Sequence, residues 1–375
     1  MRILKKAELK GILGMFFFAF LLGAVILTLT GTLTQWFGWR LPWEKSITNK
    51  IVFVSNRNGH PDIWIMNPDG SEQKPLTDDE FVDSDPLVSP DSYMIVFVSS
   101  RGQDGSQIYA MDVDGSHLHR ISKISGAKSQ VSFSHDGSEL TFLCGGELWR
   151  IGSDGSMPGR VLPTQQEASI ARMNGTKAYY VWAERSPDGK QLAGVRSADD
   201  KQEAVLMNDN ADAPKILTPT TDRGALPITE EQVFGKWNPG EAKLALTMTD
   251  SKGTGLLLVV DVENNDIPVL YNGNALIDPT WSADGSKIAA VEIKRRNAND
   301  YIPTKLMSLD ISKREAKVVD KGEITDAGWA TSGEVITYCK NGDIYSADVE
   351  TGKITNLTKG KGNNTSPAWA PSAEK

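Results

Sequence analysis

The sequence predicts an all-β fold, a seven-bladed β-propeller preceded by one N-terminal transmembrane α-helix. Three observations lead to this prediction. Residues 11–37 form a long apolar segment, the chain beyond residue 50 consists of short strand-like runs, and one turn motif recurs seven times. The copies lie roughly 40–50 residues apart, and four short strands in a repeat of that length are typical of a propeller blade.

The first ten residues are basic and the segment after them is uncharged. Residues 1–10 contain four basic side chains and one acidic side chain, and 11–39 contain no charged residue. About 20 apolar residues of helix span a ~30 Å hydrocarbon core, and basic residues before the span favour a cytoplasmic N-terminus. The run is longer than the ~7–15 residues of a secretory signal, and no Ala-x-Ala cleavage site follows. We therefore predict an uncleaved single-pass anchor in the cytoplasmic (inner) membrane, with a cleaved signal peptide as the alternative.

These features divide the chain into four predicted parts. They are a basic cytoplasmic head at 1–10, a transmembrane helix at 11–37, a linker at 38–50 and a propeller at 51–375. The formal net charge is −8, and removing residues 1–10 leaves 36 basic and 47 acidic side chains. A body this acidic argues against a nucleic-acid partner, because such proteins need a basic surface facing the phosphates.

The turn motif supplies the period of the repeat. An apolar or aromatic residue is followed by Ser or Asn, then Pro or Ala, then Asp-Gly or a variant of it. Its copies begin at Val88, Phe133, Arg185, Trp237, Trp281, Trp329 and Trp369. Asp-Gly favours a tight hairpin turn because Gly tolerates positive φ, and we expect the preceding aromatic residue to form a wedge between neighbouring blades.

The two ends of the repeat array predict how the ring closes. The first unit begins at Ile51 with its second strand and lacks the motif, whereas the last motif, at Trp369, has no strands after it. We therefore expect the C-terminal strand to complete the first blade, which removes the open sheet edges.

Two early repeats carry a more specific pattern. Ile51–Ser55 and Ile95–Ser99 are each followed by an arginine, Arg57 or Arg101, and then by a strand that ends in Asp-Gly. This pattern resembles the TolB-type propeller repeat, and the resemblance covers residues 51–372. It is weaker in the fourth blade, where Arg185 occupies the aromatic position, and in the fifth, which reads Asn-Pro-Gly. TolB proteins are soluble, with six blades and an added N-terminal domain, so the resemblance implies the fold and not their role in envelope assembly.

Candidate binding residues lie on one face of the predicted ring. The loops between second and third strands and the connections between blades share a face, which we call the loop face; the connections include 165–177 and 220–231. Rigid scaffolds usually bind ligands through such loops. The residues predicted to bind at the channel mouth on this face are Arg57, Arg101, Arg295, Arg296, Asp85 and Asp278. The alternative for Arg57 and Arg101 is a structural role in the repeat, with Asp85 and Asp278 as possible partners.

Catalytic and metal-binding motifs are weak in this sequence. It contains no Gly-x-Ser-x-Gly, so we expect no serine hydrolase of the prolyl oligopeptidase type. His117-x-His119 supplies only two potential metal ligands, and Asp112–Ser116 resembles the start of a calcium loop but has Lys123 where the loop needs Glu. We expect no metal and no cofactor. Without a Cys-x-x-Cys, the two cysteines, Cys144 and Cys339, are expected as separate reduced thiols at matching positions of two blades.

Together these features predict a membrane-tethered extracytoplasmic propeller that acts as a binding scaffold and not as an enzyme. Its partner would be a protein, a peptide or another cell-envelope ligand at the channel mouth, in the periplasm or outside the cell. Two alternatives remain open: a propeller hydrolase or lyase that acts on glycan or peptide, and an accessory subunit of a membrane complex.

Overall fold

The computed structural model describes one of the two compact units of the chain. The units are 1–45 and 46–375. The described residues are 46–198, 201–209, 214–217, 220–221, 224–225, 234–249, 254–264, 266–297 and 300–371. The predicted membrane span at 11–37 and most of the linker therefore lie outside the described residues. Within these ranges, no helix has both the length and the apolar character that crossing a bilayer requires.

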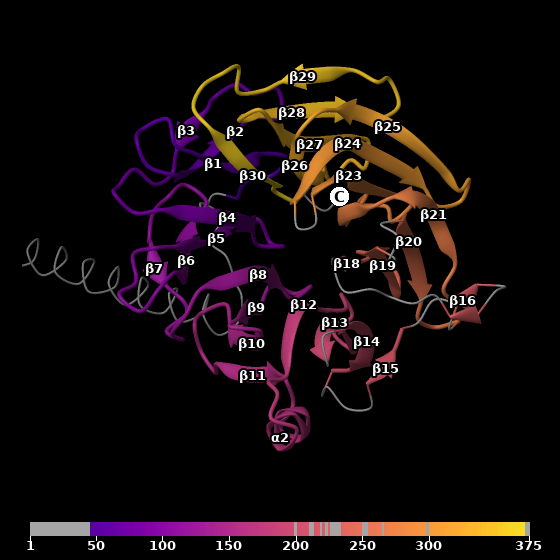
Figure 1. Ribbon diagram of the computed structural model, residues 1–375. Coiled ribbons are helices and arrows are strands. Elements are labelled where there is room, and N and C mark those ends of the chain that lie inside the picture. The colour runs from indigo at the N-terminus through magenta and orange to yellow at the C-terminus, as the bar shows by residue number, and fades with distance from the viewer. Residues whose placement is uncertain are drawn as a thin grey trace, which may run out of the picture. The chain divides into compact units, whose positions relative to one another are not determined.

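Seven four-stranded antiparallel sheets follow one another around a central axis, as the sequence predicts (Figure 1). From the innermost strand outward, blade 1 is β30 (Asn364–Trp369), β1 (Ile51–Ser55), β2 (Asp62–Met66) and β3 (Lys74–Pro75). Blade 2 is β4 (Asp83–Val88), β5 (Met94–Ser99), β6 (Gln107–Asp112) and β7 (His119–Arg120). Blade 3 is β8 (Lys128–Phe133), β9 (Glu139–Cys144), β10 (Glu147–Gly152) and β11 (Gly159–Leu162).

The remaining four blades repeat this order. Blade 4 is β12 (Tyr179–Arg185), β13 (Gln191–Ala198), β14 (Lys201–Asn208) and β15 (Lys215–Ile216). Blade 5 is β18 (Phe234–Trp237), β19 (Lys243–Thr249), β20 (Thr254–Asp261) and β21 (Val269–Asn274). Blade 6 is β22 (Leu276–Trp281), β23 (Lys287–Asn297), β24 (Asp300–Asp310) and β25 (Glu315–Lys321). Blade 7 is β26 (Ile324–Trp329), β27 (Val335–Lys340), β28 (Asp343–Asp348) and β29 (Ile354–Asn356).

The ring closes within blade 1. The last strand of the chain, β30, pairs antiparallel with β1, so Ile51 lies opposite Trp369 and Ser55 opposite Asn364. This confirms the predicted closure, in which the C-terminal strand supplies the innermost strand of the first blade. The pairing covers the inner edge of β1, which would otherwise expose unpaired backbone groups.

The hydrophobic core lies between blades. Among the described residues, each buried apolar cluster joins two neighbouring sheets; one cluster, for example, packs Val96 of β5 against Phe142 of β9. The cluster that joins the last blade to the first contains Ile344 of β28 and Phe53 of β1. Because both faces of the central strands are covered, every residue of β1 and β2 is buried, and only Ser55 and Asp62 at the strand ends are polar.

The motif tryptophans are wedges with a defined hydrogen bond. Trp237, Trp281 and Trp329 are buried, and each donates its indole N–H to a backbone carbonyl of the preceding blade. The acceptor in each case is the residue just before that blade's own motif. In blade 1 a side chain relays the contact, since Trp369 donates to Thr337 Oγ1 at 3.0 Å and Thr337 donates to the Gly328 carbonyl.

The turn of the motif has the geometry that its sequence predicts. Gly137 and Gly285 have φ near +70°, a region that a side chain at Cβ disfavours. Asp136 accepts hydrogen bonds from Ser134 Oγ and from the backbone N–H of Ser138, and these bonds lower the pKa of Asp136 to about 2.

Blade 4 replaces the aromatic wedge with charge. Arg185 binds Glu139 of blade 3 at 3.2 Å and Asp209 of its own blade at 2.6 Å. The boundary between blades 3 and 4 is therefore bridged by an ion pair at the position where the other late blades use tryptophan.

Two elements lie in the connections between blades. The connection from blade 3 to blade 4, which the sequence predicts only as a loop-face connection, contains helix α2 (Gln165–Met173) with a Thr164–Glu167 capping box. The connection from blade 4 to blade 5 contains a two-stranded sheet of β16 (Thr220–Thr221) and β17 (Gly224–Ala225). The rest of the predicted 220–231 connection lies outside the described residues.

Candidate functional site

Arg101 of the predicted loop-face site is held by carboxylates of its own propeller. Its guanidinium binds Asp83 at 2.5 Å and also pairs with Asp79, and it stacks over Phe81 with its Cζ 5.4 Å from the ring centroid. The Arg101 side chain is only 9% exposed and that of Asp83 is fully buried. The sequence offered Asp85 as a partner, but the carboxylates that Arg101 binds are Asp83 and Asp79.

Arg57 occupies the equivalent position of blade 1 with neutral partners. It donates to Ser55 Oγ at 2.8 Å, to Gln73 Oε1 at 2.6 Å and to Asn364 Oδ1 at 2.9 Å. Its Cζ lies 4.4 Å from the ring centroid of Trp64, within the range of a cation–π contact. Both arginines thus tie the second strand of a blade to its innermost strand, which is the structural role that the sequence left open.

Arg295 and Arg296 lie in a strand where the sequence predicted a loop. β23 runs through both residues to Asn297, and Arg295 pairs with Tyr301 of β24. Their side chains lie outside the described set, so their predicted binding role stays a prediction.

Asp85 and Asp278 share one position of the repeat with residues that the sequence analysis missed. Each lies three residues before the motif, in the innermost strand, where a β-bulge interrupts the pairing and φ is positive. Among the described residues five have this geometry, and they are here called the axial ring: Asp85, Gln130, Asp278, Asp326 and Ser366. The spacing of three residues before the motif was the signal that could have found the other three.

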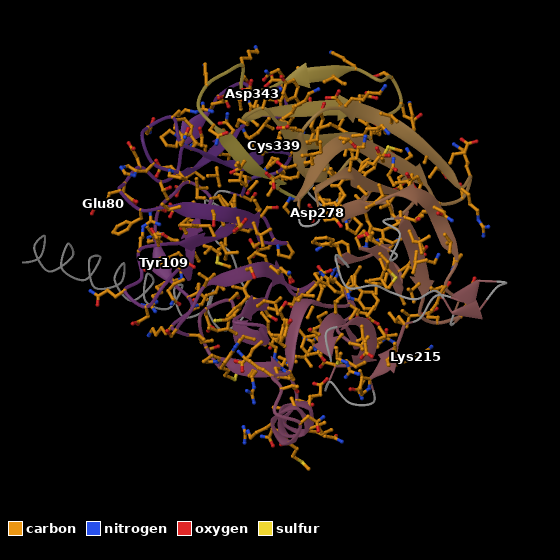
Figure 2. All side chains as sticks on the ribbon, in the orientation of Figure 1. Glu80, Tyr109, Lys215, Asp278, Cys339 and Asp343 are labelled. Carbon is orange, nitrogen blue, oxygen red and sulfur yellow. The ribbon has the colours of Figure 1, made fainter. Side chains whose placement is uncertain are left out.

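Two members of the axial ring make hydrogen bonds to the neighbouring blade. Asp326 Oδ2 accepts a hydrogen bond from the backbone N–H of Ser366 at 3.3 Å, which links blades 7 and 1. Gln130 Nε2 donates to the Val181 carbonyl of blade 4 at 2.9 Å. Figure 2 shows Asp278 at the inner rim of the ring of blades. The innermost strands of blades 1, 2, 3, 6 and 7 thus each contribute one equivalent residue.

Three members of the axial ring are carboxylates that solvent reaches. Asp85, Asp278 and Asp326 are all exposed. The protein that surrounds Asp278 still removes part of its hydration and raises the pKa of its carboxyl, and the negative charge of Asp326 raises this pKa further. The inner strands of blades 2, 6 and 7 therefore each carry one exposed carboxylate at the same repeat position.

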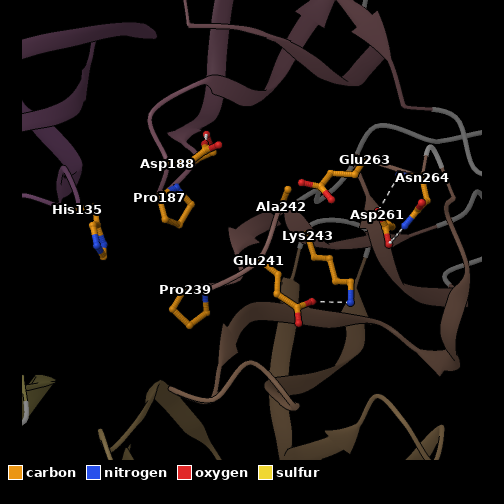
Figure 3. Close-up of a pocket in the computed structure, with 12 residues that line it drawn as sticks. His135, Pro187, Asp188, Pro239, Glu241, Ala242, Lys243, Asp261, Glu263 and Asn264 are labelled. Carbon is orange, nitrogen blue, oxygen red and sulfur yellow. Dashed lines mark hydrogen bonds and ion pairs between the residues drawn. The ribbon is translucent and has the colours of Figure 1, made fainter. Parts of the chain in front are cut away.

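A pocket of about 780 Å³ opens on the opposite face, which carries the tight turns (Figure 3). It is lined by motif turns that include His135, Pro187 and Pro239, and by the outer turn of blade 5. Ion pairs and turn hydrogen bonds engage several of its charged groups, as between Glu241 and Lys243 and between Asp261 and Asn264. The sequence predicts binding on the loop face and gives no signal for this pocket.

A second pocket, of about 490 Å³, lies between α2 and blade 4. Its polar wall is a closed network, because Glu167 accepts hydrogen bonds from Tyr180 at 2.8 Å and from Arg196 at 3.1 Å. Arg196 also binds Glu203 at 3.0 Å. These bonds fix α2 to the propeller.

The two cysteines are buried, and His117 lies in an exposed turn. Cys144 and Cys339 are both buried and free, as predicted, but their positions do not match. Cys144 pairs with Lys128, the first residue of its inner strand, and Cys339 with Thr325, the second. Exposed His117 binds Asp112 at 2.7 Å within a turn, and this carboxylate raises the pKa of His117.

Comparison with known proteins agrees with this architecture. Residues 45–152 match the family described as the TolB beta propeller domain. The uncharacterized peptidase YuxL of Bacillus subtilis (strain 168) is 30% identical over 105 residues, which are 28% of this chain and 15% of that protein. The chain spans less than two thirds of the length of the curated relatives it matches.

Two solved structures share the fold at low sequence identity. TolB from Acinetobacter baumannii is similar with a TM-score of 0.52 and 19% identity, over 86% of this chain and 67% of that chain. A prolyl endopeptidase is similar with a TM-score of 0.58 and 12% identity, over 83% of this chain and 48% of that chain. Residues 45–152 therefore match a TolB beta propeller domain, and the solved structures show the β-propeller fold of the chain as a whole.

Proposed function

We propose that this chain is a membrane-tethered extracytoplasmic scaffold whose propeller binds a positively charged segment of a protein or peptide at the axial ring. One observation carries the proposal: Asp85, Asp278 and Asp326 occupy the same repeat position, reach solvent and surround the same axis. Carboxylates that converge on one end of an axis attract a cationic ligand, because their fields add where the ligand would enter.

The contacts of Arg57 and Arg101 support a cationic ligand over an anionic one. The charge of Arg101 is neutralised by Asp83 and Asp79. The guanidinium of Arg57 donates hydrogen bonds to Ser55, Gln73 and Asn364. Both side chains would have to leave partners inside the propeller before they could bind a carboxylate. The axial carboxylates need no such rearrangement.

The binding test uses the full chain in detergent micelles and two fluorescent peptides of equal length, one lysine-rich and one glutamate-rich. We expect the lysine-rich peptide to bind more tightly, with an affinity that falls as salt screens the charges. The variant D85N/D278N/D326N should bind it at least tenfold more weakly. Equal binding by this variant and the parent protein would refute the axial site.

The matched control changes as many carboxyl groups on the opposite face. D188N/E241Q/E263Q alters the pocket on the turn face and leaves the axial ring intact. We expect this variant to keep the affinity of the parent protein. If only this control lost binding, the peptide would bind at the turn face and not at the axial ring.

The tether is proposed from residues 11–37 alone. We expect the full chain to sediment with membranes and to resist extraction by high salt, and a chain that lacks residues 11–37 to be released. Protease added outside intact cells or spheroplasts should digest the propeller. Protection of the propeller in spheroplasts would contradict the proposed orientation.

The proposal assigns binding and no catalysis to the propeller. A bound lysine-rich peptide should therefore remain intact during prolonged incubation, as mass spectrometry can check. Cleavage of the peptide by the parent protein would favour the hydrolase alternative instead.

A further inference from the structure

Three carboxylates meet one arginine at the junction of blades 1 and 2. Asp62 begins β2, Asp79 lies in the connection and Asp83 begins β4, and one oxygen from each lies within 4.8 Å of the others. Arg101 is the cation that binds two of them, Asp79 and Asp83. Three carboxylates and one guanidinium leave this junction, here called the acidic nook, with net negative charge.

Asp62 is the under-compensated member of the acidic nook. It is 1% exposed, and its Oδ2 has no hydrogen-bond partner among the described residues. Its Oδ1 has only long contacts, 3.3 Å to Thr77 Oγ1 and 3.4 Å to the Asp79 backbone N–H. Burial raises the pKa of Asp62 to about 6, as expected for a carboxylate without a compensating charge.

The repeat contains a second copy of this nook, in which the same aspartate is fully satisfied. Asp343 begins β28 as Asp62 begins β2. Its Oδ1 accepts hydrogen bonds from Thr358 Oγ1 at 2.6 Å and from the Gly360 backbone N–H at 2.8 Å. Its Oδ2 accepts one from Asn356 Nδ2 at 2.9 Å. Figure 2 marks Asp343 in this copy and Glu80 in the connection of the acidic one.

Substitutions between the two copies remove donors and add negative charge at the junction of blades 1 and 2. Pro75 holds the strand position of Asn356 and has no side-chain donor for Asp62. The five replacements, from the neutral copy to the acidic one, are Asn356 to Pro75, Lys359 to Asp78, Gly360 to Asp79, Lys361 to Glu80 and Asn364 to Asp83. Both copies thus contain an arginine, Arg101 or Arg57, but only the copy at the junction of blades 1 and 2 surrounds it with acidic side chains.

We propose that the acidic nook binds one Ca²⁺ ion through the carboxylates of Asp62, Asp79 and Asp83. Calcium takes oxygen ligands at 2.3–2.6 Å, so ligand atoms of one ion can lie up to about 5 Å apart, which suits the observed spacing. A divalent ion would neutralise the negative charge of the three carboxylates that Arg101 does not compensate. The Asp79 side chain is 35% exposed and gives the ion a path from solvent.

The bound ion would link the first two blades. Asp62 belongs to blade 1 and Asp83 to blade 2, so one ion would hold both strands to the connection between them. This site is separate from the axial ring, and the inference does not depend on the proposed function.

The test is titration of CaCl₂ into chelator-treated full chain in detergent micelles, followed by isothermal calorimetry and by thermal unfolding. We expect one calcium ion per chain at this site, and a rise of several degrees in Tm when calcium is added. D62N should weaken the affinity at least tenfold and abolish the rise in Tm. Absence of calcium-dependent heat and of a Tm change in the parent protein at millimolar calcium would overturn the proposal.

The neutral copy supplies variants that keep the fold if D62N does not. P75N places an asparagine at the position equivalent to that of Asn356, so that Asp62 gains the donor that Asp343 has. D79G/D83N gives Arg101 the neutral surroundings of the other copy. Both variants should lose the calcium-dependent change in Tm. D343N and the axial variant D326N are the controls and should bind calcium as the parent protein does. Loss of binding in D326N together with full binding in D62N would place the ion at the axial ring and refute this site.

Discussion

Trp281 of blade 6 donates its indole N–H to the backbone carbonyl of Lys236 in blade 5 at 2.8 Å, and the residue is only 6% exposed. The same contact joins Trp329 to the Thr280 carbonyl and Trp237 to the Glu184 carbonyl. A large apolar wedge with one fixed hydrogen bond sets both the distance and the angle between successive blades. It explains why the motif recurs with the period of the blades.

We predict that Trp281→Ala lowers the free energy of unfolding by about 3–5 kcal/mol, because it leaves a cavity between two blades. Trp281→Phe keeps most of the apolar volume and loses the hydrogen bond, so a smaller loss, of about 1 kcal/mol, is expected. Urea unfolding of both variants checks the order. Equal losses would mean that the ring volume contributes little.

We predict that Arg101→Ala destabilises the propeller by about 3–5 kcal/mol, because Asp83 is then buried without its cation. Arg57→Ala should cost less, about 1–2 kcal/mol, since its hydrogen-bond partners are neutral. Adding D83N to Arg101→Ala should restore part of the loss. Denaturant unfolding measures all three, and no recovery in the double variant would contradict the assigned pairing.

Asp278 should make stability fall as pH rises. Its pKa is raised in the folded protein, so the folded state favours the neutral acid and is relatively more stable below pH ~4 than above it. Asp278→Asn removes this dependence. We expect it to raise the free energy of unfolding at pH 7 by less than about 1 kcal/mol, because solvent reaches the site, and to have no effect near pH 3.

The comparison for this pH effect is thermal unfolding of the two proteins at pH 3 and pH 7. If Asp278→Asn stabilised the protein more at pH 3 than at pH 7, the pKa of Asp278 would not be raised in the folded protein. Asp188→Asn provides a control of opposite sign, since hydrogen bonding to Ser186 lowers the pKa of Asp188.

Deletion of residues 362–375 should open the ring. It removes β30, exposes the inner edge of β1 and uncovers the apolar cluster between blades 7 and 1. We expect a loss of cooperative thermal unfolding and concentration-dependent aggregation, measured by calorimetry and light scattering. Deletion of 372–375 alone keeps β30 and should leave both unchanged; an intact, monomeric ring in the longer deletion would refute closure by this strand.

Much of the fold follows from the sequence because its signals are local and repeated. The motif at Trp281 and the missing first strand before Ile51 predicted the number of blades and the way the ring closes. The role of Arg101 could not be assigned in the same way. Its carboxylate partners, Asp79 and Asp83, lie among several acidic residues of similar sequence distance, and only the folded connection selects between them and Asp85.

By itself the sequence determined the period, the seven blades and the apolar segment at 11–37, because hydrophobic runs and turn residues act over a few positions. The tertiary structure decided which polar residues meet. It brought Asp278, Asp326 and Ser366 to one axis and left Asp62 without the donor that Asn356 gives Asp343. Such contacts join residues from different blades or strands, and their partners are set by backbone register and curvature rather than by neighbours in the chain.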